Sequence, residues 1–136
     1  MNGRRWQFVG DIRFIRLLAV LASLLLSLLA VLLNELPNTD AYTYVKAAEL
    51  ALQNGPAAAF AHYQWAHLPL LMAALHMLTG MSLFAAANLV NALLFALLSG
   101  SFVAIVATIT PSRRTVWLAL VCVLAYPHLN EFRAYI

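Results

Sequence analysis

The sequence predicts an all-α integral membrane protein, and two observations predict this class: the composition and two long apolar runs. Of the 136 residues, 64% are hydrophobic and 10% are charged, whereas soluble domains are about half apolar and a quarter charged. The nearly continuous apolar runs at residues 14–33 and 83–109 are each long enough to cross the roughly 30 Å hydrocarbon core as a helix. Lipid is therefore the expected solvent for most of the surface.

The basic residues at the start of the chain predict the orientation of the first span. Arg4, Arg5, Arg13 and Arg16 lie before or at the beginning of the first apolar run. Because cytoplasmic flanks of membrane helices are enriched in Lys and Arg, we expect a cytoplasmic N-terminus. The run is longer than the apolar region of a signal peptide and lacks a small-x-small cleavage site. The chain has no dense basic patch with interleaved aromatics, so nucleic acid is not an expected partner.

Residues 34–81 are expected to form an outer loop that contains two interfacial helices. The first, at residues 41–54, has polar and apolar residues on opposite sides, and Gly55-Pro56 predicts its end. The second, at residues 68–79, is bounded by a proline and a glycine, the usual punctuation of a helix. Its apolar core is too short to span a bilayer, which indicates an interfacial or re-entrant position.

The second and third spans are expected at residues 82–109 and 116–129, joined by a cytoplasmic loop at residues 110–115. Residues 130–136 would begin a second outer loop. The polar residues of the second span are expected to face other helices rather than lipid. They are Asn88, Asn91, Ser99 and Ser101.

A four-span alternative is possible if residues 68–79 cross the membrane. That arrangement would place Arg113 and Arg114 outside, against the positive-inside rule. The three-span arrangement keeps both arginines in the cytoplasm and puts Glu131 on the same outer side as Asp40. We therefore expect one membrane module of three spans over residues 1–136.

Asp40 is the first candidate for chemistry, because it follows the first span and precedes a predicted helix. In one interpretation its carboxylate binds a divalent cation or activates a nucleophile at the outer face. In the other it only caps the helix, which contributes about 0.5–2 kcal/mol. Thr39 could cap instead and leave Asp40 free. Glu35 could share the site, but a solvated position at the headgroups is its simpler role.

Glu131 is the second candidate, because a carboxylate after an apolar segment must lie outside the hydrocarbon or be paired. Asp40 and Glu131 are thus the candidate ligands of a divalent cation, the one cofactor we consider. His128 is spaced to share a metal with Glu131, although Pro127 disfavours a regular helix there. Arg133 is the nearest basic partner of Glu131, but positions two apart do not face each other on a helix. Lys46 and Arg133 are candidates for contact with a lipid phosphate.

The remaining reactive side chains are expected to be structural. His62, His67 and His76 are each expected to be satisfied interfacial or core histidines. Cys122 lies in an apolar run and is expected to be a small buried hydrophobe. The sequence contains no Cys/His zinc spacing, no phosphate-binding glycine loop and no Gly-x-Ser-x-Gly elbow.

The order of elements and several short motifs resemble a known family. The chain resembles the N-terminal part of the polytopic glycosyltransferases of the C superfamily (GT-C), which include the protein O-mannosyltransferases and lipid A aminoarabinose transferases. The resemblance runs from about Arg13 to Ile136. The residues that carry it are the run Asp40-x-Tyr42-x-Tyr44, Ala47-Ala48 followed by Asn54-Gly55, His67-Leu68-Pro69-Leu70-Leu71, Leu78-Thr79-Gly80 and Ala85-Ala86-Ala87-Asn88-Leu89-Val90-Asn91-Ala92-Leu93.

The resemblance implies a large membrane enzyme that transfers a sugar from a polyprenyl-phosphate carrier at the outer face, usually with inversion. In that family an acidic residue of the first outer loop is catalytic, and Asp40 is the matching position. Several members have an Asp-Glu pair there, whereas Ala41 follows Asp40 here. The family needs more than three spans, so the chain is expected to be the N-terminal portion of a longer enzyme or a truncated, inactive relative.

A non-enzymatic protein is the alternative. In this interpretation the chain is a small interaction or assembly subunit held by helix packing, and Asp40 is only a cap. The shortness of the chain and its small residues at Ala85-Ala86-Ala87 and Gly100 favour this reading, because small residues let membrane helices approach closely.

Overall fold

A computed structural model describes residues 2–33, 39–110 and 112–133, and for residues 2–10 the backbone alone. Within these ranges every regular element is a helix, which confirms the all-α class. Two of the helices are long and apolar enough to cross a bilayer: residues Asp11–Leu33 of α1 (Asn2–Leu33) and α5 (Leu83–Ile109). Both coincide closely with the first two expected spans.

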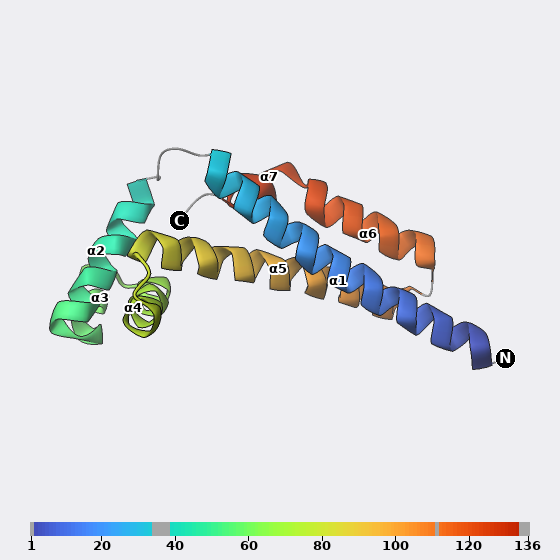
Figure 1. Cartoon of the computed structure of the whole chain (residues 1–136), viewed down its shortest axis with the longest axis horizontal. Helices are drawn as coiled ribbons and strands as arrows, with labels where there is room; N and C mark the ends of the chain where they lie inside the picture. Colours follow the sequence, from blue (N-terminus) through green and yellow to red (C-terminus); the bar gives the residue numbers. More distant parts are fainter. Residues whose placement is uncertain (1, 34–38, 111, 134–136) are drawn as a thin grey trace.

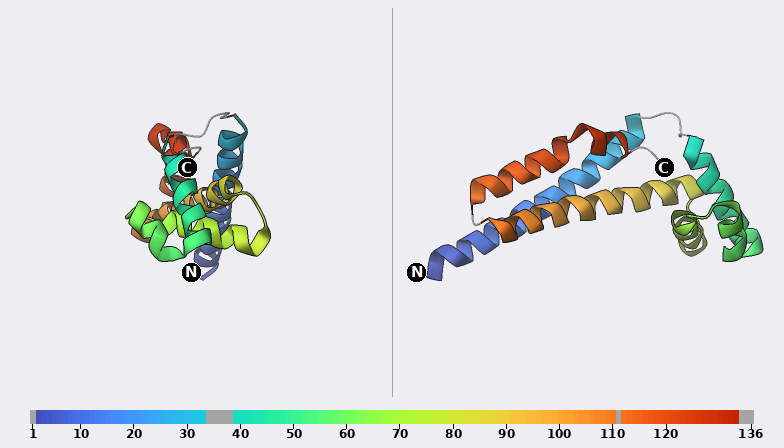
Figure 2. Two further views of the ribbon diagram at one scale, coloured as in Figure 1. Left: turned by 90° about the vertical axis from the view of Figure 1, so that its left-hand side faces the viewer. Right: turned by 180° about the vertical axis from the view of Figure 1, so that it is seen from behind.

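Helices α1 and α5 lie side by side and form the long axis of the molecule (Figures 1 and 2). Small residues line their contact, and the helices are tightly packed at Gly100, where an added Cβ would lie 2.8 Å from Cγ2 of Val20. Ala19, Ser23 and Ser99 are buried in the same contact region. The leucines on the outer faces of both helices are largely exposed, which suits contact with lipid chains.

The third expected span is not one continuous helix. Helix α6 (Arg113–Ala125) stops at Tyr126, whose backbone is extended, and Pro127 then begins the short α7 (Pro127–Glu131). Proline has no N–H to donate and disfavours a helical conformation in the residue before it, which explains the break. The 13 residues of α6 extend only about 20 Å. Residues 116–129, expected as the third span, are therefore divided between two helices, and a three-span topology stays a prediction.

Helix α6 packs against both long helices. One buried cluster contains residues from all three helices. It consists of Ile15 and Ala19 of α1, Val103 of α5, and Val116, Leu120 and Val123 of α6. Burial of these side chains gives α1, α5 and α6 a common apolar core.

Three shorter helices form a cap at one end of the long pair (Figure 1). They are α2 (Thr39–Asn54), α3 (Pro56–His62) and α4 (His67–Thr79). Helix α2 ends at Gly55, whose φ of 85° is in the left-handed region that glycine tolerates, and Pro56 starts α3. Gly80, with φ of 72°, ends α4 in the same way. Helices α2 and α4 begin within two residues of the predicted starts, and α3 is an additional helix.

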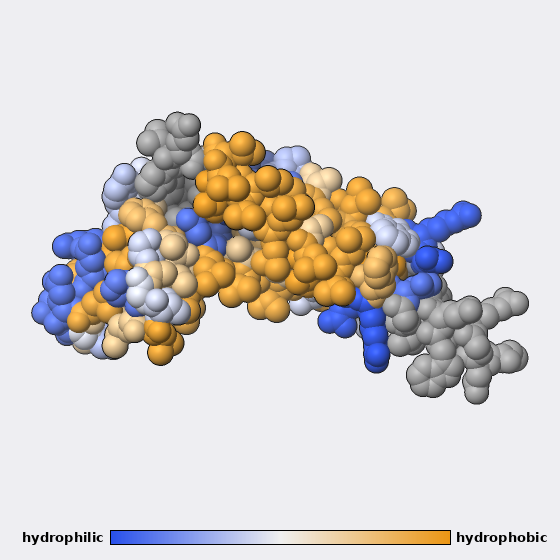
Figure 3. Space-filling view, in the orientation of Figure 1, coloured by the Kyte–Doolittle hydropathy of each residue, from blue (hydrophilic) through white to orange (hydrophobic). Residues whose placement is uncertain are grey.

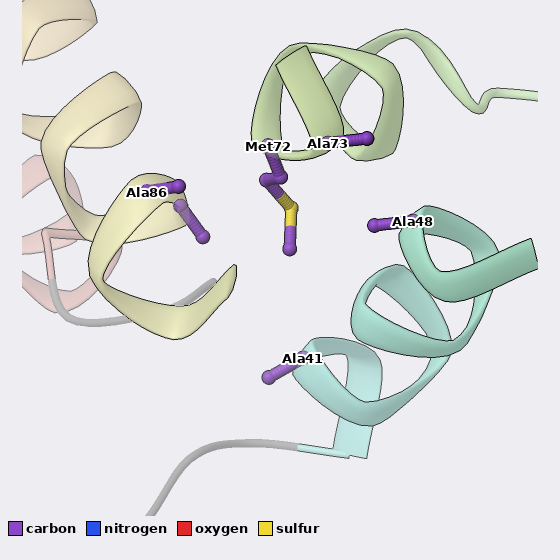
Figure 4. Close-up of a cluster of buried hydrophobic side chains, with 6 residues drawn as sticks. Ala41, Ala48, Met72, Ala73 and Ala86 are labelled. Carbon is purple, nitrogen blue, oxygen red and sulfur yellow. The ribbon is translucent and has the colours of Figure 1, made fainter. Parts of the chain in front are cut away.

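Alanines and one methionine join the cap to α5 (Figure 4). Met72 of α4 is fully buried between Ala41 and Ala48 of α2 and Ala86 of α5. Among the described residues, α4 contacts α2, α3 and α5 but not α1. Helix α4 therefore belongs to the cap and does not run alongside the long pair.

The opposite end of the molecule is basic. Asp11 of α1 and Arg113 at the start of α6 form an ion pair of 3.6 Å between Oδ2 and Nε. This contact places Arg113 at the same end as Arg13 and Arg16. The face shown in Figure 3 is hydrophobic in the middle and hydrophilic toward both ends, as expected for a module that crosses a bilayer.

We expect Gly100→Leu to destabilise the contact between α1 and α5. The new side chain would collide with Val20, and overpacking of this kind costs about 1–3 kcal/mol. Thr108→Leu is the matched control, because Thr108 is exposed on the same helix. The measurement is the free energy of unfolding in detergent. Equal stability of the two variants would contradict the close packing at Gly100.

Candidate functional site

Asp40 lies in the first turn of α2, with an exposed side chain. Because α2 already includes Thr39, Asp40 lies inside the helix rather than at its N-cap. A carboxylate in the first turn interacts favourably with the positive end of the helix dipole without being the cap. The carboxylate oxygens of Asp40 are thus exposed at the end of the molecule formed by the short helices α2, α3 and α4. Glu35 is also outside the described residues.

Two tyrosines, Tyr44 and Tyr63, pack against each other near Asp40. Tyr44 is one turn further along α2, and its ring centroid is 5.3 Å from that of Tyr63. The hydrogen bond between their side chains, together with burial and the nearby charge of Asp40, raises the pKa of Tyr44 to about 12. Tyr44 therefore stays protonated at neutral pH and fixes Tyr63, which belongs to the segment between α3 and α4, against α2.

Lys46, a phosphate candidate, is engaged at the surface. Its Nζ lies 3.3 Å from Oε2 of Glu49, one turn along α2, and both side chains are about half exposed, at 57% and 43%. Exposed pairs of this kind contribute little to stability. Lys46 can therefore leave Glu49 at small cost to meet another anion.

The metal candidates do not assemble into a multi-ligand site within the described residues. No group of three or more His, Cys, Asp or Glu side chains that could hold a metal occurs there. Glu131 contacts His128 instead, at 3.5 Å between Oε2 and Nδ1, and both side chains are exposed. Helix α7, which carries Glu131, lies toward the capped end of the bundle (Figure 1), but in the described part of the chain it does not contact α2, which carries Asp40.

Arg133, a candidate for contact with a lipid phosphate, is buried and does not pair with Glu131. Its side chain is 1% exposed and reaches between the two long helices. Nη1 donates to the carbonyl and hydroxyl oxygens of Ser23, both at 2.9 Å, and to Oγ of Ser27 at 3.0 Å. Nε donates to Oδ1 of Asn130 at 2.7 Å, and Cζ lies 4.9 Å from the centre of the Phe95 ring.

The surroundings of Arg133 hold the adjacent backbone as well. The amide of Asn91 donates to the carbonyls of Phe132 and Arg133, at 3.0 and 3.1 Å. The amide of Asn130 donates to the carbonyl of Leu124 near the end of α6, at 2.9 Å. The bond from Asn130 satisfies a carbonyl that the break between α6 and α7 leaves unpaired, and the bonds from Asn91 satisfy carbonyls that follow the end of α7.

Arg133 is a buried cation without a carboxylate partner among the described residues, and its Nη2 has no hydrogen-bond partner there. Ser23 is about 15 Å along α1 from Leu33, so the guanidinium lies near the middle of that helix's apolar part. Charges at such depth are costly and face the protein interior. Guanidinium has donors only, so this group can orient or attract anionic and carbonyl groups but cannot act as a base.

The sequence did not reveal this cluster, because Ser23 and Ser27 are isolated polar residues within the apolar run at residues 14–33. Their spacing of four places both hydroxyls on one face of α1, and Ser99 of α5 donates to Ser23 at 3.2 Å. The paired serines on one face were the signal for a polar partner at that depth.

The remaining candidates have structural or exposed positions. Nδ1 of His76 lies 2.7 Å from the carbonyl of Met81, so this histidine is satisfied locally. The His67 ring packs edge-on against Phe60, at 5.4 Å between centroids, and His62 is exposed. Cys122 was expected to be buried, but it is exposed on α6. It lies on the side of α6 that faces away from the buried cluster of Val116, Leu120 and Val123.

Comparison with known proteins adds no family assignment. No protein-family model matches the chain, and no match is found among curated proteins or solved structures.

We expect the hydrogen bonds from Arg133 to couple strongly to the two serines. In the wild type, Ser23→Ala with Ser27→Ala removes acceptors from a buried charge, and each such bond contributes about 1.5–3 kcal/mol. In an Arg133→Met background the same serine changes should be close to neutral. Unfolding free energies of the four proteins in the cycle measure the coupling, and Ser101→Ala, at an exposed serine, is the control. Additive effects would show that the serines do not hold the guanidinium.

We expect Tyr44 to be the source of a stability loss at high pH. A pKa raised to about 12 in the folded state, against 10.0 otherwise, means that the protonated form stabilises the fold below pH 10. This stabilisation decreases as the pH rises from 10 through 12. Thermal unfolding between pH 9 and about 12 should show the loss in the wild type and in Tyr42→Phe, and not in Tyr44→Phe. The same pH dependence in all three proteins would contradict the assignment.

Proposed function

We propose that this chain is the N-terminal membrane module of a glycosyltransferase that takes a sugar from a polyprenyl-phosphate donor. In this proposal the transfer occurs at the outer face of a bacterial cytoplasmic membrane, with the N-terminus in the cytoplasm. Asp40 acts as general base toward the acceptor or orients a divalent cation. The partners are the lipid bilayer and the polyprenyl-phosphate-linked sugar.

The observation that carries the proposal is the exposed carboxylate of Asp40 on a helical cap at one end of two long apolar helices. Such a carboxylate can meet a carrier whose sugar and phosphate lie at the membrane surface and whose isoprenoid chain lies in the lipid. The order of elements that underlies the GT-C resemblance also supports the proposal: a long helix with a basic start, a loop with short helices, and a second long helix.

The two phosphate candidates take different roles in this proposal. Lys46 is exposed, and its partner Glu49 holds it only weakly, so it can contact a donor phosphate near Asp40. The guanidinium group of Arg133 donates hydrogen bonds to Ser23, Ser27 and Asn130. We therefore assign Arg133 to the positioning of α7, and with it Glu131, rather than to phosphate binding.

The assembly-subunit alternative loses part of its motivation. Ala86 and Ala87 are buried against α2 and α4, and Gly100 is buried against Val20. These small residues are explained by packing within the chain, so they do not require a partner helix.

We expect Asp40→Asn to reduce sugar transfer at least 100-fold in the full protein, because general-base catalysis typically contributes 10²–10⁴. The assay measures transfer from a radiolabelled polyprenyl-phosphate sugar in membranes that contain the protein. Glu49→Gln is the control, since it removes an exposed carboxylate from the same helix. Asparagine at position 40 leaves the fold intact, apart from about 0.3–1 kcal/mol of dipole interaction. Undiminished transfer by Asp40→Asn at normal expression would refute the catalytic role.

A further inference from the structure

A groove runs between α1 and α5 near the basic end of the molecule. Its volume is about 260 Å³, and both polar and apolar residues line it. Arg13 and Arg16 of α1 and Ser101 of α5 supply the polar groups, and Gly100 leaves space because it has no side chain. Leu17 and Leu97 are among the apolar residues of the lining.

The two arginines of the groove carry charge that the described part of the chain does not neutralise. They are three residues apart on α1, so they lie on the same face of the helix. Both side chains are exposed, and no carboxylate among the described residues pairs with either one. Asp11, the nearest acidic residue in the sequence, pairs with Arg113 instead.

The depth of the groove matches the boundary between lipid headgroups and acyl chains. The pair between Asp11 and Arg113 marks the polar end of the bundle. Arg13 and Arg16 follow Asp11 by about 3 and 7.5 Å along α1. Leu17 and Leu97 continue the groove toward the hydrophobic middle of the helices. The groove is therefore positively charged at the end near Asp11 and apolar toward the middle of the helices.

We propose that this groove is a binding site for an anionic phospholipid of the leaflet at the basic end. The lipid phosphate lies between Arg13 and Arg16, the hydroxyl of Ser101 donates to an ester oxygen of the lipid, and one acyl chain lies along Leu17 and Leu97. Basic grooves between membrane helices bind anionic headgroups through this combination of charge and apolar contact. The site is at the opposite end of the molecule from Asp40, so the inference does not depend on the glycosyltransferase proposal.

The test counts lipids that remain bound to the purified protein in native mass spectrometry, with dioleoyl phosphatidylglycerol or dioleoyl phosphatidylcholine added. We expect the wild type to retain one phosphatidylglycerol in preference to phosphatidylcholine. The double variant Arg13→Gln with Arg16→Gln should lose this preference, and its affinity for phosphatidylglycerol should decrease about 30-fold. Arg113→Gln with Arg114→Gln is the matched control, because it removes two positive charges at the same end without altering the groove.

A second variant tests the location without a change of charge. Ser101→Phe places a ring in the groove and should also abolish the retained phosphatidylglycerol, and it decides the question if the arginine variant does not fold. Equal retention of the two lipids by the wild type would overturn the proposal. So would an equal loss in the control pair, which would indicate general attraction to the basic end, or full retention by Ser101→Phe.

Discussion

The packing of the last described segment depends on one requirement: a buried guanidinium group must have hydrogen-bond acceptors. Arg133 finds them on α1, at Ser23 and Ser27, and the surrounding bonds from Asn91 and Asn130 fix the backbone on both sides of the break at Tyr126. The five residues of α7 have few other anchors: none of them is buried, and Leu129 packs, partly exposed, against the cluster that contains Ile15 and Val116. One side chain therefore determines where the last part of the described chain returns to the bundle.

Most of the helices could be predicted from the sequence, because their limits are set by local chemistry. Pro56 and Gly80 determine helix boundaries through backbone geometry alone, and the apolar run of α5 is limited by its own composition. The same local reasoning indicated that Pro127 disfavours a regular helix, but it did not identify Tyr126 as the residue at which α6 ends. The predicted start of α2 was two residues too late, because three residues that favour the N-cap position occur in succession there.

The candidate site was less predictable, because its contacts are between distant parts of the chain. Asp40 could be selected as a candidate from its place after the first span. The structure places it in the first turn of α2 with an exposed side chain. The contact of Arg133 with Ser23 joins residues more than a hundred positions apart, and no periodicity within either segment specifies it. The expected burial of Cys122 failed for a related reason. The apolar character of its segment does not distinguish a face toward protein from a face toward lipid.

The position of Arg133 also implies an order of assembly. Helices α1 and α5 satisfy their own backbone groups and can each enter a bilayer as separate units. The segment from Arg113 to Arg133 cannot do so, since α6 is short, the backbone is broken at Tyr126, and its one buried charge has most of its acceptors on another helix. The groups that hold this segment lie on both long helices, at Ser23 of α1 and Asn91 of α5. Docking of the third segment therefore requires that the first two long helices be packed together.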